Sequence, residues 1–276
     1  MSTILDTIVS RKRQEVDRQK HRISVRELER ADYFSRQINS LKDSLHASGK
    51  TGIIAEFKRK SPSKGQFNEL SQVGEVTAGY AKSGASGLSI LTDSDFFGGS
   101  MQDLRDGRVA NPEIPILRKD FIIDEYQIIE AKANGADVIL LICECLQRSE
   151  IQTLASVARN LGLEVLLEMH TRRQLDKIVD AISMVGINNR DLETFQVDLN
   201  RSMELAAEIA GSLPTIAESG IGSPGTMKLL RQAGFDGFLI GEQFMKQADP
   251  VKAFQEFVRE YQLIEGLSGS YSTDQV

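Results

Sequence analysis

Eight short apolar runs recur between residues 52 and 241 and alternate with stretches of helical periodicity. Each run is long enough for one strand, and the runs cover residues 52–57, 86–91, 115–118, 137–142, 164–168, 184–188, 214–218 and 236–241. Glycines fall after several helical stretches, where helix C-caps are expected. Strands that alternate with helices pair in parallel and are joined by right-handed crossovers. The chain is therefore predicted to be an α/β protein.

Eight such units, about 20 to 35 residues apart, favour a closed (β/α)8 TIM barrel over a doubly wound open sheet. An open sheet that binds dinucleotides would carry Gly-x-Gly-x-x-Gly after its first strand, and the chain has none there. We expect one barrel domain over residues 1–265, which includes an N-terminal helical extension at about 4–48. Residues 266–276 read as a flexible C-terminal tail.

Composition narrows the class of partner and of site. The net charge is −6 and the isoelectric point about 5.3, which argues against nucleic acid or an anionic membrane as the main partner. No apolar stretch approaches the length of a membrane span, and the N-terminus lacks a signal-peptide core, so we expect a cytoplasmic protein. The cysteines and histidines share no metal-ligand spacing, so no metal site is expected.

A basic run, Arg11, Lys12 and Arg13, lies in the N-terminal extension. Acidic residues are interspersed along the same segment, among them Glu15 and Asp17. A cluster of mixed sign is typical of a solvated helix face. We therefore interpret the run as solvated surface and not as a binding site.

Several of the apolar runs end in ionisable or polar residues, and these are the candidates for catalysis: Glu56, Lys58, Lys119, Glu168 and Asn188. In a β-strand, alternate residues share a face, so Glu56 and Lys58 lie on the same side as Ile54. If Ile54 packs inside the barrel, both charges project from its mouth. The carboxyl ends of barrel strands are where active sites lie, so the pattern indicates an enzyme.

Lys119 shares a strand face with a leucine, and a buried lysine is costly unless it is paired. It suits a proton donor, a Schiff-base donor or an anion anchor, and we interpret Asp120 as its structural partner. Two neighbouring lysines, Lys58 and Lys119, are expected to lower each other's pKa. For Arg190, after the sixth run, a role in the pocket and a structural salt bridge carry equal weight.

Glycine-rich turns follow the last two apolar runs and indicate a phosphate site. Gly220, Gly222 and Gly225 follow the seventh run, where Pro224 opens a helix, and Gly241 follows the eighth. Backbone N–H groups of these two loops, together with a helix N-terminus, form the usual phosphate site of such barrels. The acidic chain would therefore bind phosphate locally and not through a basic surface.

Five segments, taken in order, resemble the indole-3-glycerol phosphate synthase family of tryptophan biosynthesis. They are IAEFKRKSPS at 54–63, PILRKDF at 115–121, LE at 167–168, GINNRDL at 186–192 and AESGI at 217–221. The resemblance runs from about residue 4 to 262 and includes the N-terminal extension. It implies a phosphorylated small-molecule substrate, 1-(2-carboxyphenylamino)-1-deoxyribulose 5-phosphate, which closes to an indole with loss of CO2 and water. It also implies that neither a metal nor an organic cofactor is needed.

The resemblance assigns a task to each charged strand end. Lys119 would be the general acid that donates to the ribulose carbonyl oxygen. Glu168 would stabilise the developing iminium charge or accept a proton during dehydration. Lys58 would hold the anthranilate carboxylate, Glu56 would assist proton transfer and Asn188 would orient the sugar hydroxyls. A monomer or weak homo-oligomer is expected, and association with other tryptophan-pathway enzymes is left open.

The remaining pocket residues implied by the resemblance are Ser61, Arg190, Glu218, Ser219, Phe121 and Phe96 or its neighbour Phe97. Phosphate would lie on Ser61 and on the amides around Gly220, Gly241 and Glu242. Some members of the family carry serine at the position of Glu242. Because a carboxylate repels phosphate, we expect the backbone amide of Glu242 to bind while its side chain turns away.

Three other functions are compatible with a phosphate-binding barrel. A phosphoribosylanthranilate isomerase would lack the N-terminal extension and the Lys119–Glu168 pair, and would use a cysteine and an aspartate. A class I aldolase would use Lys119 as a Schiff base. A barrel that only binds a phosphorylated metabolite would not need the full set of charged strand ends.

Overall fold

The computed structural model describes residues 3–61, 65–68, 71–191, 196–209 and 211–266. In this part of the chain, eight parallel strands close into a barrel in the order β1-β10-β9-β8-β7-β6-β5-β4. The strands are β1 (Ile53–Phe57), β4 (Gly87–Leu91), β5 (Ile116–Lys119), β6 (Val138–Ile142), β7 (Glu164–Met169), β8 (Met184–Asn188), β9 (Thr215–Glu218) and β10 (Gly237–Ile240). The predicted (β/α)8 barrel is confirmed, and each apolar run corresponds to one strand.

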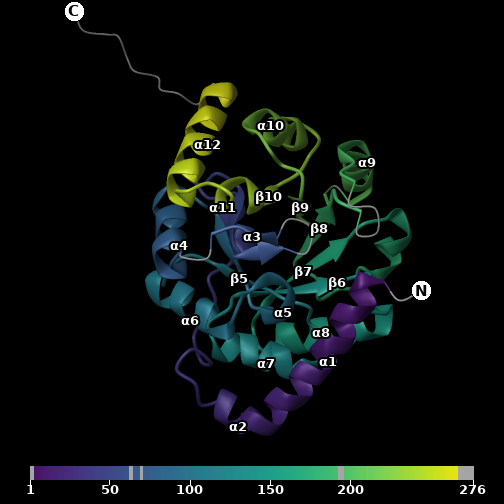
Figure 1. Ribbon diagram of the computed structural model, residues 1–276. Coiled ribbons are helices and arrows are strands. Elements are labelled where there is room, and N and C mark those ends of the chain that lie inside the picture. Colours follow the sequence, from purple (N-terminus) through teal and green to yellow (C-terminus); the bar gives the residue numbers. More distant parts are fainter. Residues whose placement is uncertain (1–2, 62–64, 69–70, 192–195, 210, 267–276) are drawn as a thin grey trace, which may run out of the picture.

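Helices surround the barrel, as Figure 1 shows. They are α4 (Val73–Lys82), α6 (Met101–Ala110), α7 (Glu125–Ala133), α8 (Arg148–Asn160), α9 (Leu199–Ile209), α10 (Pro224–Gln232) and α12 (Pro250–Glu265). Shorter pieces are α5 (Ser94–Phe97), α11 (Glu242–Met245) and a 3-10 helix, η1 (Arg172–Lys177), which stands between β7 and β8. After β1 a small antiparallel pair, β2 (Lys60–Ser61) and β3 (Gly65–Gln66), was not foreseen from the sequence.

Alternation along the strands separates two apolar layers. On β1, Ile53, Ala55 and Phe57 pack outward in the cluster shared with the helices, whereas Ile54 packs in the barrel interior with residues such as Leu117 and Leu166. Since side chains two apart on a strand share a face, Glu56 and Lys119 project from this interior toward the mouth. The expected orientation of the charged strand ends is confirmed.

The N-terminal extension forms α1 (Ile4–Arg22), α2 (Val25–Leu28) and α3 (Leu41–Leu45) before the first strand. α3 closes the floor of the barrel, because Leu41 and Leu45 belong to the interior cluster. Its first turn is held by Glu164 at the start of β7, which accepts from Ser40 Oγ at 2.6 Å and from Leu41 N at 2.8 Å. α1, purple in Figure 1, lies beside α7.

Of the predictions for the basic run of the N-terminal extension and for the C-terminal tail, the first is partly wrong and the second lies almost wholly outside the described residues. The solvated-surface interpretation of the basic run is wrong for Lys12, which is only 1% exposed. α12 ends at Glu265, and the Gly266 cap has a φ of 71°, in the left-handed region that favours glycine. Of the predicted flexible tail, residues 267–276 lie outside the described residues.

Candidate active site at the barrel mouth

A cavity of about 240 Å³ opens at the carboxyl ends of the strands. The predicted site residues that line it are Glu56, Lys58, Ser61, Lys119, Phe121, Glu168, Asn188, Arg190, Glu218, Ser219, Gly220, Gly241 and Glu242. Its apolar wall comes from Leu91, Phe97, Leu140, Ile142, Ile221, Leu239 and Ile240. The fold thus brings nearly all of the predicted site together.

Phe96 is the exception, and its predicted place in the pocket is wrong. Its neighbour Phe97 lines the cavity and lies against Phe121, with 6.1 Å between the ring centroids. Phe96 lines a separate shallow hollow with residues of α1, such as Arg11. Consecutive residues of a helix point about 100° apart, so only one of the two rings on α5 can face the substrate.

Lys119 is the centre of the charged group. Its Nζ lies 2.8 Å from Glu168 Oε2 and 3.1 Å from Glu218 Oε2. Lys119 and Glu218 are the last residues of β5 and β9, and Glu168 is the last but one of β7; these are alternate strands of the barrel. Side chains from alternate strands share one layer of a barrel interior, which explains why residues so distant in sequence meet.

This pairing sets the pKa of Lys119. Burial by itself would lower that pKa, but the negative charges of Glu168, Glu218 and Glu56 outweigh it and raise the pKa above its ordinary value. The expectation that the two lysines lower each other's pKa is therefore wrong for Lys119. Its nearest charged neighbours are carboxylates, which hold it as an ammonium ion.

The two carboxylates that share Lys119 differ in proton affinity. Burial raises the pKa of both. For Glu168, the charges of Lys119 and His170 and a hydrogen bond from Asn188 reverse this effect, so its pKa lies below the ordinary value. For Glu218, Lys119 opposes burial but the charge of Glu168 reinforces it, so its pKa is raised. Glu218 is thus the one of the pair that takes up a proton first.

A second ion pair stands at the end of β1. Lys58 Nζ lies 2.7 Å from Glu56 Oε1, and 5.8 Å above the ring centroid of Phe67. Glu56 is buried against the backbone of Gly241, where a Cβ would come within 2.6 Å of Oε1. Glycine at 241 is therefore required by the close approach of this carboxylate.

Asn188 and Arg190 hold the β8 side of the mouth. Asn188 Nδ2 donates to Glu168 Oε1 at 3.0 Å, and its Oδ1 accepts from the backbone N–H of Arg190 at 3.0 Å. Arg190 lines the cavity and also pairs with Glu242, with 3.5 Å between Nη2 and Oε2. Arg190 thus forms a salt bridge and also lies in the cavity wall, and its role toward a substrate stays a prediction.

The loop after β9, which was predicted to bind phosphate, begins with two residues of unusual backbone conformation. Ser219 and Gly220 both take left-handed conformations, with φ of 66° and 71°. Asn189 fixes this turn by donating from Nδ2 to the Ser219 carbonyl at 2.7 Å. Across the mouth, the Ser61 hydroxyl is buried and has no hydrogen-bond partner among the described residues.

Sequence reasoning missed two sets of residues. Ile4, Leu5 and Ile8 of α1 line the cavity, although their spacing shows only a helix face. His170 is buried with Nε2 3.4 Å from Glu168 Oε1. It follows Glu168 by two residues at the end of β7, so strand alternation was a usable signal for this second contact.

Within the described residues, no group of three or more His, Cys, Asp or Glu side chains is placed to hold a metal ion. The same part of the chain contains no helix with the length and apolarity needed to span a membrane.

Residues 5–257 match the family model of indole-3-glycerol phosphate synthase. The chain belongs to the indole-3-glycerol phosphate synthase family. An indole-3-glycerol phosphate synthase of Bacteroides thetaiotaomicron is 48% identical over 95% of this chain and all of its own length. Another, of Polynucleobacter asymbioticus, is 40% identical over 93% of this chain and 99% of its own length. The activity is therefore that of the family, a carboxy-lyase reaction in tryptophan biosynthesis.

Solved structures add the fold alone. A 3-hexulose-6-phosphate synthase superposes with a TM-score of 0.61 at 15% identity, and covers 75% of this chain and 98% of its own. A tryptophan synthase α subunit from Legionella pneumophila superposes with a TM-score of 0.62 at 16% identity, over 83% and 99% of the two chains. Both likenesses support the (β/α)8 barrel.

Proposed function

We propose that the mouth cavity closes the indole ring of 1-(2-carboxyphenylamino)-1-deoxyribulose 5-phosphate with Lys119 as general acid. The observation that carries the proposal is the position of Lys119 Nζ in the wall of the mouth cavity, 2.8 Å from Glu168 and 3.1 Å from Glu218. An ammonium ion held by two carboxylates is fixed in direction and charged before the substrate arrives.

The two ends of the cavity give the substrate a direction. The phosphate lies on Ser61, the last residue of β2, and on the amides around Gly220, Gly241 and Glu242, which follow β9 and β10. The aromatic ring lies toward Phe97 and Phe121, with Lys58 on its carboxylate. Because the wall at this end is apolar, the anthranilate carboxylate loses part of its hydration when it enters, which favours its departure as CO2.

Ring closure forms a bond between the ring carbon that bears the carboxylate and the ribulose carbonyl carbon. Lys119 gives a proton to the carbonyl oxygen, which becomes a hydroxyl, and the ring nitrogen becomes an iminium. Glu168 stabilises this positive charge. Loss of CO2 then returns an electron pair to the ring and restores its aromaticity.

Dehydration completes the indole. Lys119, which has regained a proton from solvent, gives the proton with which the new hydroxyl leaves as water, and Glu168 accepts the proton lost from the adjacent carbon. Glu56 relays protons next to Lys58. Asn188 orients Glu168 through its 3.0 Å hydrogen bond and offers contact to the sugar hydroxyls. The steps together release one CO2 and one water for each substrate.

Lys119→Ala tests the proposal. Loss of the general acid is expected to lower kcat by about 10²- to 10⁴-fold. The chain contains no tryptophan, so indole fluorescence from product rises over almost no protein background. Lys252→Ala, on the exposed face of α12, is the matched control and should retain the wild-type rate.

Near wild-type turnover by a folded Lys119→Ala variant would contradict the assignment of the acid. Borohydride treatment with substrate present separates the aldolase alternative, because the proposed reaction forms no imine with lysine. Trapping of substrate on Lys119 would contradict the proposed step.

We also propose that the enzyme works in the cytoplasm as a monomer or weak homo-oligomer. Large exposed apolar residues among the described residues, such as Val25 on α2, Val109 on α6 and Leu263 on α12, come from separate helices. Sedimentation at micromolar concentration should give a mass close to the 30.6 kDa of one chain. A stable larger assembly would contradict this proposal. Co-sedimentation with other tryptophan-pathway enzymes tests for association.

A further inference from the structure

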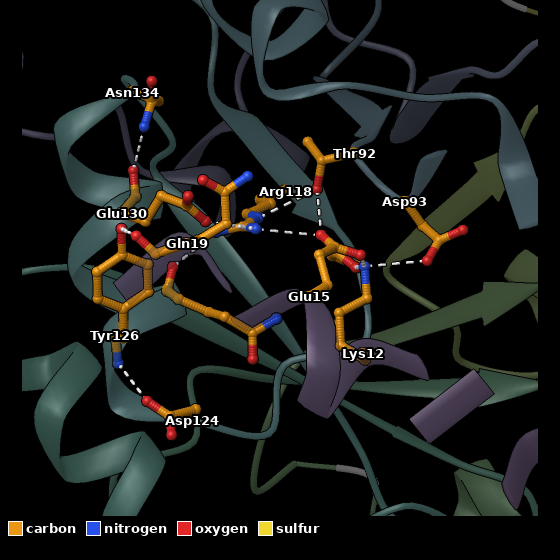
Figure 2. A network of polar contacts seen from close by, with 12 residues as sticks. Lys12, Glu15, Gln19, Thr92, Asp93, Arg118, Asp124, Tyr126, Glu130 and Asn134 are labelled. Atoms are coloured by element: carbon orange, nitrogen blue, oxygen red, sulfur yellow. Dashed lines mark hydrogen bonds and ion pairs between the residues drawn. The ribbon is translucent and has the colours of Figure 1, made fainter. Parts of the chain in front are cut away.

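Lys12 lies in the middle of α1 with its ammonium group buried among carboxylates. Its side chain is 1% exposed, and Nζ lies 2.9 Å from Glu15, 3.0 Å from Asp93 and 2.9 Å from Asp120. Figure 2 shows Lys12 reaching from the helix toward Asp93. A buried ammonium is costly unless it is paired, so this arrangement fixes α1 in one position on the barrel.

The two partners outside α1 belong to mouth segments. Asp93 follows β4 and caps α5, accepting from Phe96 N at 2.8 Å. This capping places the turn that carries Phe97. Asp120 directly follows Lys119 and was expected to pair with it, but it contacts Lys12 instead.

Asp120 is itself held firmly. It accepts from Thr92 Oγ1 at 2.5 Å, from Arg118 Nη2 at 3.1 Å and from Phe121 N at 2.8 Å. Arg118 extends the network to Glu130 on α7 at 2.9 Å, as Figure 2 shows. The position of α1 is therefore connected by polar contacts to the end of β5.

Tyr126 on α7 donates to the Gln19 carbonyl of α1 at 3.2 Å and packs with Val16, but the other ion pairs between α1 and the barrel in the described residues are exposed. Arg11 pairs with Asp95 at 2.9 Å and Lys20 with Asp124 at 2.7 Å, with side chains between 33% and 56% exposed. Exposed pairs of this kind contribute little to stability. Lys12 is thus the buried ionic anchor between α1 and the mouth.

The N-terminal end of α1, before this anchor, covers the cavity. Ile8 stands one turn before Lys12 on the same helix face, and Ile4 stands one turn before Ile8. Both line the cavity with Leu5. Ile8 is 4% exposed, while Ile4 is 45% exposed at the rim. The wall that these side chains form depends on where Lys12 holds the helix.

We propose that Lys12 is a positioning residue that holds α1 closed over the ring-binding end of the cavity and, through Asp93 and Asp120, places Phe97 and Lys119. The inference rests on the proposed function, because it concerns the same cavity. It adds a residue outside the cavity and predicts which end of the substrate depends on it.

The ring order of the strands makes that dependence selective. The anchors of Lys12 follow β4 and β5, whereas Gly220 follows β9, which is four strands from β5 in the eight-stranded ring. β5 and β9 are therefore diametrically opposite. Loosening α1 should weaken binding of the ring and leave the phosphate loop after β9 unchanged.

Lys12→Met tests the proposal, since it removes the charge and keeps a long unbranched side chain. If α1 remains closed in about one tenth of the molecules, KM rises about tenfold, because apparent affinity falls with the binding-competent fraction. kcat should change less, by about threefold at most. Lys12→Arg, which keeps a cation, should restore most of the loss in KM.

Lys20→Met is the matched control on the same helix. It breaks an exposed pair with Asp124 and should leave KM unchanged. Inhibition by anthranilate and by inorganic phosphate then separates the two ends of the cavity. Lys12→Met should weaken inhibition by anthranilate about tenfold and leave inhibition by phosphate as in the wild type.

An unchanged KM in folded Lys12→Met, or equal weakening of both inhibitors, would overturn the proposal and leave Lys12 with a purely structural role. If Lys12→Met does not fold, Asp93→Asn tests the same link, since asparagine can still cap α5 but carries no charge. Lys119→Ala is assayed in parallel. Loss of activity there with an unchanged Lys12→Met would uphold the proposed function and reject this inference.

Discussion

Arg190 and Glu242 form an ion pair at the phosphate end of the mouth, with 3.5 Å between Nη2 and Oε2. Left alone, the Glu242 carboxylate would repel a phosphate bound at its own backbone amide. Arg190→Gln should therefore raise KM about tenfold, which corresponds to about 1.4 kcal/mol of lost binding. Adding Glu242→Gln should recover most of that loss. Equal KM values for the single and double variants would show that Arg190 acts on the substrate and not through Glu242.

Phe96 and Phe97 are adjacent on α5, so their alanine variants form a matched pair that tests the proposed ring-binding end of the cavity. Phe97 lines the cavity against Phe121, and Phe96 faces a hollow beside α1. An aromatic contact is worth about 0.5–1.5 kcal/mol beyond its buried area, so Phe97→Ala should raise KM by about tenfold or more. Phe96→Ala should change KM by less than about twofold. A larger effect at Phe96 than at Phe97 would mean that the substrate ring binds elsewhere.

Gly186 in β8 leaves room for Glu218. A Cβ at Gly186 would overlap Glu218 Oε1, so Gly186→Ala must displace the carboxylate that pairs with Lys119. A displacement of about 1 Å in an active site can cost about 10²-fold in rate, and overpacking costs about 1–3 kcal/mol of stability. We expect kcat of Gly186→Ala, measured by product fluorescence, to fall by about 10²-fold. Thermal unfolding should show that the variant still folds.

Gly74→Ala, near the start of α4, is the control for this substitution. A Cβ there meets Ala110 at an ordinary 3.5 Å, so stability should be unchanged or slightly higher. If Gly186→Ala and Gly74→Ala had the same kcat and the same stability, the explanation that Gly186 leaves space for the Glu218 side chain would be wrong.

The raised pKa of Glu218 predicts how stability depends on pH. A carboxyl group with a raised pKa in the folded state contributes stability below its unfolded pKa, about 4.3, and loses it as pH rises through the folded value. Glu218→Gln cannot ionise. Its Tm relative to the wild type should therefore rise by roughly 2 to 8 °C between pH 4 and pH 8. A constant difference in Tm across this range would show that Glu218 titrates normally.

Local rules predicted the barrel and most of its mouth. Apolar runs set the strands, and alternation by two placed Glu56 beside Ile54 on the interior face. The same rule holds for Lys119 and Glu168. The rule works because a strand that is buried on both faces can place a charged side chain only at its end.

The errors concern contacts between elements distant in sequence. The mixed charges around Lys12 are typical of a solvated helix face, but that criterion ignores carboxylates contributed by Asp93 and Asp120, which lie on other segments. The pKa of Lys119 was misjudged for the same reason. On α5, sequence could not decide between two adjacent phenylalanines, because the helix is only four residues long and its rotation depends on the cap at Asp93.

The packing of α3 against the floor connects a segment that precedes the first strand with the last strand of the barrel. Leu45 rests against Gly237 at the start of β10, where a Cβ would come within 2.8 Å of Leu45 Cδ2. A short helix that precedes β1 in the sequence thus packs against the strand that closes the ring beside β1. The floor of the barrel is therefore complete only when β10 is in place.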